Sequence, residues 1–151
     1  MKTLLAGSTI SGVASTTSAI NYSIYGMESA TVTGVDQNKL LAQGQLPDSP
    51  AVIYTVLADG EAMIREIDLV NSSGSQVTGI QLQIDGVPVT PPFVLEADGL
   101  AHYGTEGWKF YDKYGYLLTK RAEVNVLVGT SATPPSAAGL PDNTRYYQYL
   151  P

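Results

Sequence analysis

The residues of this chain that come closest to an acid–base group in the sequence lie between residues 96 and 106. His102 is the single histidine, and Glu96, Asp98 and Glu106 are acidic residues close to it in the sequence. A histidine base needs a nucleophile to activate, and no Gly-x-Ser-x-Gly turn is present to supply one. A glycosidase needs two acids flanking a groove, whereas acids in a Glu-Ala-Asp-Gly segment are typical of solvated turns. The sequence therefore predicts no enzyme and no catalytic residue.

Neither a metal nor a cofactor is indicated. With one histidine and no cysteine, a tetrahedral zinc site would need three or more carboxylates, which no local spacing supplies. The acidic turns at 58–61 and 96–99 lack the spacing of a calcium loop, and no glycine-rich phosphate-loop motif occurs. The sequence predicts no cofactor and no metal site.

Aromatic side chains are the remaining candidates for a binding surface. These candidates are Trp108, Tyr111, Tyr114, Tyr116, Tyr146, Tyr147 and Tyr149. Exposed rings with polar tips suit either a subunit interface or stacking on sugars. For Trp108, the alternation of Trp108 and Phe110 with Lys109 and Tyr111 favours packing of Trp108 and Phe110 into the core.

The elements that position these residues are expected to be strands. Ile80, Leu82 and Ile84 alternate with polar residues, and turn residues recur about every ten residues between Ala51 and Ala101. This spacing predicts an all-β fold, an antiparallel β-sandwich of jelly-roll-like or immunoglobulin-like type. The residues predicted to face its core are Ile67, Leu69, Ile80, Leu82, Ile84, Val124 and Val126.

Three regions follow from composition. Residues 1–35 are expected to form a nearly uncharged β-hairpin, with strands at 4–13 and 19–27, packed on the body or on a neighbouring subunit. Residues 36–129 should form the sandwich, closed by the strand around 122–128. Residues 130–151, rich in Pro, Ser, Ala and Gly, should form an extended C-terminal tail. Its tyrosines would dock either on a partner subunit or on their own domain.

Charge and composition limit the partners. The net charge is −6, and the eight basic residues are scattered, whereas a nucleic-acid interface needs them clustered. No apolar run approaches the ~20 residues of a membrane span, and the apolar run near residue 4 is too short for a signal peptide. The uncharged N-terminal hairpin predicts a homo-oligomer, with a trimer favoured over a dimer. We expect neither a nucleic-acid nor a membrane partner.

Two segments resemble small β-sandwich domains of tailed-bacteriophage virion proteins. Residues 39–86 contain the strand Tyr-Thr-Val, the strand Ile-Asp-Leu-Val-Asn before Ser-Ser-Gly, and the strand that ends in Ile-Asp-Gly. The apolar segment Pro-Pro-Phe-Val-Leu-Glu-Ala-Asp-Gly follows. Residues 7–29 resemble the strand pair that usually closes such domains, so either the order is permuted or this pair completes a neighbouring copy.

The resemblance implies a structural protein of the phage particle, assembled in the host cytoplasm. Such a protein would be a capsid decoration or cement protein, a head fibre base or a tail accessory protein. Its partners would be other virion proteins, such as the major capsid or tail proteins. The alternative is a host-surface glycan-binding module on the phage head or tail fibre, which would use Trp108 and the nearby tyrosines.

Overall fold

The computed structural model describes residues 2–30, 38–118, 126–129 and 145–148. This part of the chain is all-β, with 61% strand and no helix. The strands are β1 (Lys2–Leu4), β2 (Thr9–Val13), β3 (Ile20–Ala30), β4 (Lys39–Gln45), β5 (Ala51–Thr55), β6 (Gly60–Asn71), β7 (Val77–Ile84), β8 (Val87–Pro88), β9 (Phe93–Leu95), β10 (Leu100–Gly104), β11 (Gly107–Tyr111), β12 (Val126–Gly129) and β13 (Arg145–Gln148).

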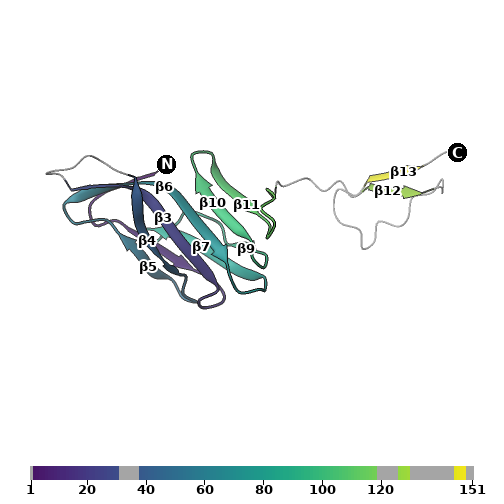
Figure 1. Ribbon diagram of the computed structural model, residues 1–151, viewed down its shortest axis with the longest axis horizontal. Coiled ribbons are helices and arrows are strands. Elements are labelled where there is room, and N and C mark those ends of the chain that lie inside the picture. Colours follow the sequence, from purple (N-terminus) through teal and green to yellow (C-terminus); the bar gives the residue numbers. More distant parts are fainter. Residues whose placement is uncertain (1, 31–37, 119–125, 130–144, 149–151) are drawn as a thin grey trace. The chain divides into compact units, whose positions relative to one another are not determined.

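Strands β1 to β11 form two antiparallel sheets that pack together (Figure 1). The first sheet has the order β11-β10-β6-β3-β4, with β1 also paired to β6. The second has the order β5-β2-β7-β8, with β9 also paired to β7. The predicted antiparallel β-sandwich is therefore confirmed.

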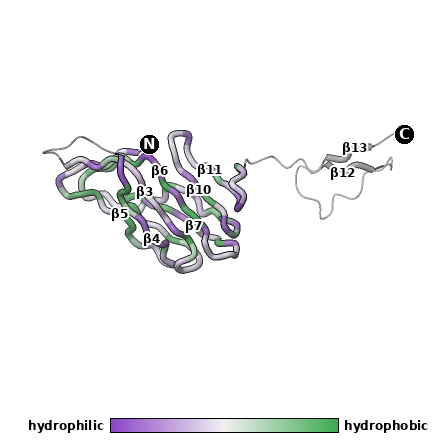
Figure 2. The backbone as a smooth tube through the Cα atoms, in the orientation of Figure 1, coloured by the Kyte–Doolittle hydropathy of each residue, from purple (hydrophilic) through white to green (hydrophobic). Residues whose placement is uncertain are grey.

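The core lies between the two sheets, and hydrophobic residues alternate with polar ones along many strands (Figure 2). Of the predicted core residues, Ile67, Leu69, Ile80 and Leu82 are buried, and Ile84 is half-buried against them. Val124 lies outside the described residues, and Val126 lies in β12, which is not part of this sandwich. A two-residue period thus identified the buried face of β7 correctly.

Strand β6 keeps its buried face through a β-bulge. Ile64 pairs with Gly26 and Glu66 pairs with Tyr25, so Arg65 is an extra residue. Ile64 and Ile67 are both buried although they are three residues apart, because one inserted residue shifts the alternation by one position. Position 26 must be glycine, since a Cβ there would lie 2.2 Å from the carbonyl oxygen of Met63.

The predicted N-terminal hairpin is wrong. The first segment is divided into β1 and β2, and β2 belongs to the second sheet whereas β3 belongs to the first. The link between β2 and β3 crosses from one sheet to the other, with Ala14 N–H donating to the Pro47 carbonyl and Ser18 N–H to the Leu46 carbonyl. The strand pattern was read correctly, but alternation along a strand does not specify which strand pairs with it. Both strands complete the sandwich of their own chain.

The predicted boundary between body and tail also needs correction. The chain divides into two compact units, Met1–Leu117 and Leu118–Pro151. Strand β12, expected to close the sandwich, instead pairs in parallel with β13 in the second unit. Residues 145–148 of the supposed extended tail thus form a strand. Their sequence, Arg-Tyr-Tyr-Gln, has β-forming tyrosines that the Pro- and Gly-rich composition of the tail obscured.

Asn71 ends β6 as a fully buried polar residue. Its Nδ2 donates to the carbonyl oxygens of Ser75 at 2.6 Å, Glu96 at 2.9 Å and Leu95 at 3.1 Å. Its Oδ1 accepts from the backbone N–H and the hydroxyl of Ser73. One amide group thus ties the turn after β6 to the end of β9, and its burial is compensated by these hydrogen bonds.

The first prediction tests the buried face of β7. Leu82→Ala should lower the free energy of unfolding by about 2–5 kcal/mol, because Leu82 is fully buried and its loss leaves a cavity. Gln83→Ala, at the neighbouring half-buried position, should change it by about 0.5 kcal/mol or less. Urea denaturation measures the free energy of unfolding of both variants. Equal losses in the two variants would contradict the observed register.

The second prediction concerns Asn71→Asp. A carboxylate at this site cannot donate to the three carbonyl oxygens, so the variant should lose about 3 kcal/mol or more of stability at neutral pH. Burial among acceptors should raise the pKa of the new carboxyl group in the folded state above its unfolded value. Stability is then greatest at low pH and is lost as pH rises through that raised pKa. Denaturation at a series of pH values should show that the variant's loss of unfolding free energy relative to wild type becomes smaller as pH falls. A loss that does not depend on pH would contradict this role for Nδ2.

Candidate functional site

The β10–β11 hairpin carries two of the predicted binding residues, Trp108 and Tyr111, together with His102. Tyr103 pairs with Trp108, and His102 pairs with Lys109. Successive residues face opposite sides of a strand, so Tyr103 and Trp108 share one face and His102 and Lys109 share the other. The hairpin therefore has an inner, aromatic face and an outer, charged face.

The inner face of the hairpin packs on the core. The Trp108 ring centroid lies 5.4 Å from that of Tyr103 and 5.8 Å from that of Phe93. Phe110 is edge-on to Phe93 at 5.2 Å. All four rings are half-buried against the hydrophobic core, and tilted or edge-on rings at these spacings are favourable. The alternation that favoured core packing of Trp108 and Phe110 therefore agrees with the structure.

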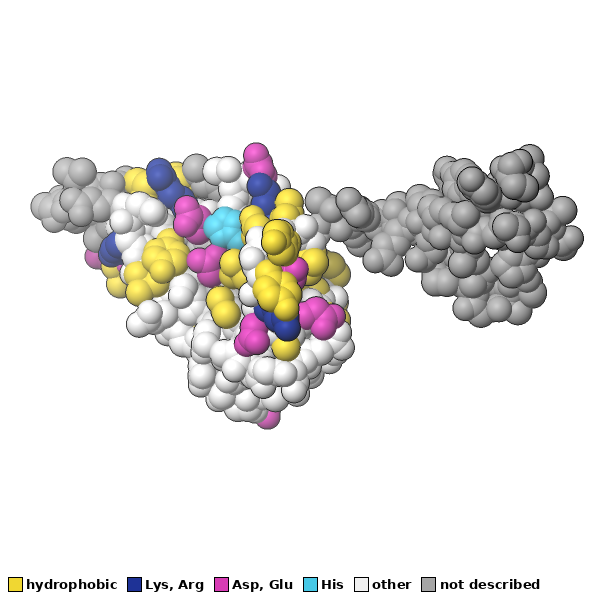
Figure 3. All heavy atoms as spheres, turned by 45° about the vertical axis from the view of Figure 1, so that its right-hand side comes forward, with side chains coloured by type: hydrophobic (Ala, Val, Ile, Leu, Met, Phe, Trp, Pro, Cys, Tyr) yellow, Lys and Arg dark blue, Asp and Glu magenta, His cyan; other side chains and the backbone are white. Residues whose placement is uncertain are grey.

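The outer face carries two pairs of charged or polar groups around a shallow hollow of about 220 Å³. His102 Nδ1 lies 2.7 Å from Asp68 Oδ1 on the neighbouring strand β6, and Lys109 bonds to Glu106. The hydrogen bond from Lys109 lowers the pKa of Glu106, and the same bond raises the pKa of Lys109. Figure 3 shows the histidine (cyan) at the surface beside acidic side chains (magenta).

In the His102–Asp68 pair the carboxylate engages Nδ1 of the imidazole, and Nε2 is the other ring nitrogen. A Cβ at Gly104 would lie 2.9 Å from that nitrogen, so the strand itself packs beside it. Sequence reasoning missed Asp68 because it lies 34 residues away and is brought to His102 only by the β6–β10 pairing.

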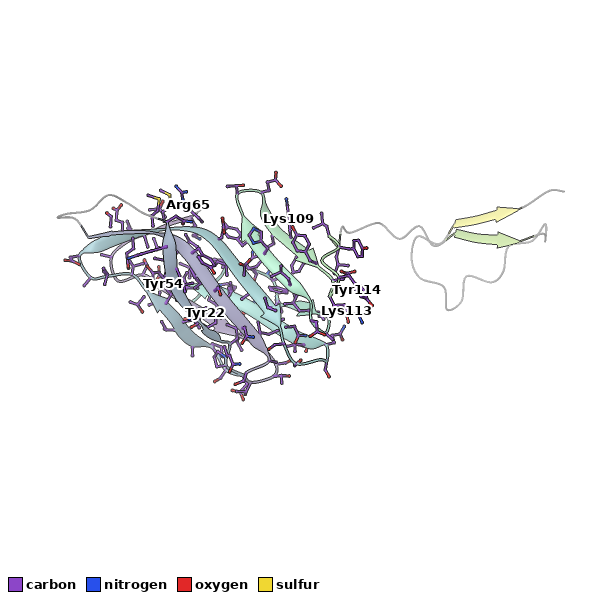
Figure 4. All side chains as sticks on the ribbon, in the orientation of Figure 1. Tyr22, Tyr54, Arg65, Lys109, Lys113 and Tyr114 are labelled. Carbon is purple, nitrogen blue, oxygen red and sulfur yellow. The ribbon has the colours of Figure 1, made fainter. Side chains whose placement is uncertain are left out.

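A second polar group ties the two sheets together near β4 and β5. The Tyr54 hydroxyl donates to Glu28 Oε1 at 2.9 Å, and Lys39 Nζ lies 3.6 Å from Glu28 Oε2. Burial raises the pKa of Tyr54, and the hydrogen bond to Glu28 raises it further. Tyr54 lies on β5 of the second sheet and Glu28 on β3 of the first (Figure 4). The hydrogen bond from Tyr54 to Glu28 joins the two sheets.

The predicted surface tyrosines lie beyond β11. Tyr114 and Tyr116 are 72% and 71% exposed, with their ring centroids 6.5 Å apart. Lys113 Nζ lies 5.0 Å from the centre of the Tyr114 ring. The Asp112 side chain accepts the N–H groups of Tyr114 and Tyr116 at 2.9 Å, which fixes the turn and holds both rings outward. We call Tyr114, Tyr116 and the exposed Leu117 the turn patch.

The other predicted site residues lie apart from the turn patch. Tyr111, the last residue of β11, is half-buried and borders the outer hollow. Tyr146 and Tyr147 lie in β13 of the second unit, opposite Leu127 and Val128 of β12. Tyr149 lies outside the described residues. The predicted set is therefore divided among the core, the outer face of the hairpin, the turn patch and the second unit.

The described residues contain neither a cluster that could hold a metal ion nor a helix that could span a membrane. In residues 2–30, 38–118, 126–129 and 145–148, no three His, Asp or Glu side chains gather in a group that could hold a metal ion. The same ranges contain no helix long and apolar enough to cross a membrane.

Comparison with known proteins finds no family model, no curated protein and no solved structure that matches this chain. The resemblance to phage virion domains therefore stays a prediction from sequence.

The third prediction uses the raised pKa of Tyr54. Tyr54→Phe removes the hydrogen bond to Glu28 and should lower the free energy of unfolding near neutral pH by about 1–3 kcal/mol. A raised folded-state pKa means that the stability contributed by the protonated tyrosine is complete below the unfolded value of about 10 and is lost as pH rises above it.

Urea denaturation between pH 7 and pH 11 should therefore show the difference between wild type and Tyr54→Phe shrinking above about pH 10. Tyr114→Phe is the matched control, because its exposed hydroxyl should contribute little at any of these pH values. A Tyr54→Phe effect that stays constant across this range would contradict the buried hydrogen bond.

Proposed function

We propose that this chain is a structural component of a bacteriophage virion that acts through contacts with other protein subunits. The virion assignment rests on the sequence resemblance of residues 7–29, 39–86 and 91–99. The assignment to a capsid decoration, cement or head or tail accessory protein rests on the same resemblance.

The turn patch carries the proposal that the chain works through a surface. Two tyrosines and a leucine project together from a turn that Asp112 holds in place. Tyrosine rings supply large contact area at a low cost in conformational entropy, and their hydroxyls tolerate a wet interface rim. Figure 3 shows hydrophobic side chains (yellow) gathered on this side of the body.

The sheet edges support the same proposal. Strands β4 and β5 are the edges of the two sheets, and Leu40 and Val52 on them are exposed. Strand β5, Ala-Val-Ile-Tyr-Thr, carries no charge that would oppose pairing with another chain. These edges favour self-association, and we propose a homo-oligomer with a trimer ahead of a dimer.

A glycan-binding role on the phage head or tail is a second candidate. Its strongest sugar-stacking ring, Trp108, packs on the core. The proposal therefore rests on Tyr114 and Tyr116, which are exposed and have Lys113 beside them. Binding of the purified protein to host cells or to a glycan array, lost in Tyr114→Ser with Tyr116→Ser, would favour this second candidate over a purely structural role.

The fourth prediction tests assembly. Particles purified with and without this chain should differ by a 16.0 kDa component and by density at defined sites in cryo-electron micrographs. Purified protein added to deficient particles should restore that density. Tyr114→Ser, Tyr116→Ser and Leu117→Ser combined should reduce rebinding at least tenfold, because they remove the apolar contact area of the turn patch.

The matched control is Val94→Ser, which removes an exposed apolar side chain on β9 outside the turn patch. It should rebind like wild type.

Sedimentation equilibrium should give a multiple of 16.0 kDa for the wild type. Particles that lack the chain in every preparation, or a triple variant that rebinds fully, would contradict the proposal.

A further inference from the structure

The first sheet has a gap beside its central strand. Strand β3 pairs along one edge of β6, while β1 and β10 share the other edge. β1 pairing begins where Lys2 meets Ile64, and β10 pairing ends where Tyr103 meets Ile67. Between these positions lies the bulge of β6, beside which no described strand is paired on that edge. The gap opens into the space between the two sheets.

An apolar cavity of about 190 Å³ lies at this gap. On the first sheet its walls include Ile64, Ile67, Tyr103 and Trp108. Ile64 and Ile67 are the two buried residues that flank the bulge, so both residues of β6 on this wall lie next to the inserted residue.

The second sheet supplies the opposite wall through Leu82 and Ile84 of β7. Val89, just after β8, lies at the rim with 41% of its surface exposed. The Val89 N–H donates to the Leu82 carbonyl at 3.0 Å, which holds this rim in place. A dry cavity of about 150 Å³ lined by such side chains can bind benzene, so this one has room for a ring or chain of at least six carbons.

Lys2 is the only charged residue among those that line the cavity. It lies two positions from the buried Leu4 on β1, so the two side chains share the face toward the core. Lys2 is exposed, and within the described residues it forms no ion pair. The cavity thus combines apolar walls with one positive charge at its rim, the arrangement that orients a ligand with an apolar body and an anionic end.

We propose that this cavity binds a small apolar carboxylate, with its hydrocarbon part between Trp108 and Leu82 and its carboxylate at Lys2. This site is separate from the surface contacts proposed above, and either one can hold without the other. The apolar part supplies most of the binding free energy, because it leaves water for a preformed apolar space. Lys2 supplies preference for a negative end.

The chain reports on this site directly, because Trp108 is its single tryptophan and lines the cavity. We would titrate the full chain with hexanoate, hexanol and hexylamine at low ionic strength and follow tryptophan fluorescence. These probes share one hydrocarbon chain and differ in the charge of the head group. Hexanoate should bind about two- to fivefold more tightly than hexanol, the range expected of a partly exposed ion pair, and hexylamine should bind most weakly.

Two variants separate the roles of charge and space. Lys2→Met keeps the length of the side chain but removes its charge. The affinity for hexanoate should therefore fall to that for hexanol, while the affinity for hexanol stays unchanged. Val89→Phe places a larger side chain at the rim from an exposed position. It should lower the affinity for all three probes at least tenfold. Thermal melting of Val89→Phe without probe checks that it folds, and hexanoate should raise the melting temperature of wild type but not of this variant.

Three results would overturn the proposal. One is an absence of saturable fluorescence change with any probe. Another is a Val89→Phe variant that folds and binds like wild type, which would place the ligand elsewhere. The third is a Lys2→Met variant whose affinities for hexanoate and hexanol fall equally, which would mean that Lys2 gives no preference for a negative head group.

Discussion

The structure of the sandwich depends on the pairing of β6 along both of its edges. Eleven of its twelve residues pair with β3 along one edge, and seven pair with β1 or β10 along the other. A strand of this length must keep a buried face over its whole course, and a single bulge at Arg65 achieves this by shifting the alternation once. The close approach of the Met63 carbonyl to Gly26 shows how tightly the neighbouring strand follows that bulge.

The two sheets are joined differently on the two sides of β6. Near β4 and β5, Glu28 bridges to Tyr54 of the opposite sheet and to Lys39, which ties the layers together. On the side of β1 and β10, the edge of β6 is shared by two short strands that leave a gap. The layers there are separated by a cavity instead of a polar bridge. The apolar cavity lies where backbone pairing along this edge of β6 is interrupted.

The polar chemistry of the described residues is mostly used to hold strands and turns. Asn71 joins two turns, Asp112 fixes the turn beyond β11, and Asp68 is paired with His102 on the adjacent strand. These hydrogen bonds fix the ends of strands and the turns between them within the described part of the chain.

Sequence alone determined the fold class and much of the buried face. Alternation at Ile80 and Leu82, with turns at regular spacing, identified an antiparallel sandwich, because burial of one face imposes a two-residue period. The placement of Trp108 and Phe110 against the core followed from the same period. The half-buried Ile84 shows where this period weakens, at the end of its strand.

Only the tertiary structure decided which strands pair. The segments 9–13 and 20–30 read as a hairpin but belong to different sheets, since backbone hydrogen bonding between strands is not encoded by alternation within either one. The same is true of β12, whose partner is β13 and not the sandwich. The His102–Asp68 pair, the Glu28–Tyr54 bridge and the cavity beside Lys2 each join residues far apart in sequence. Their chemistry arises only when strand pairing and sheet packing bring those residues together.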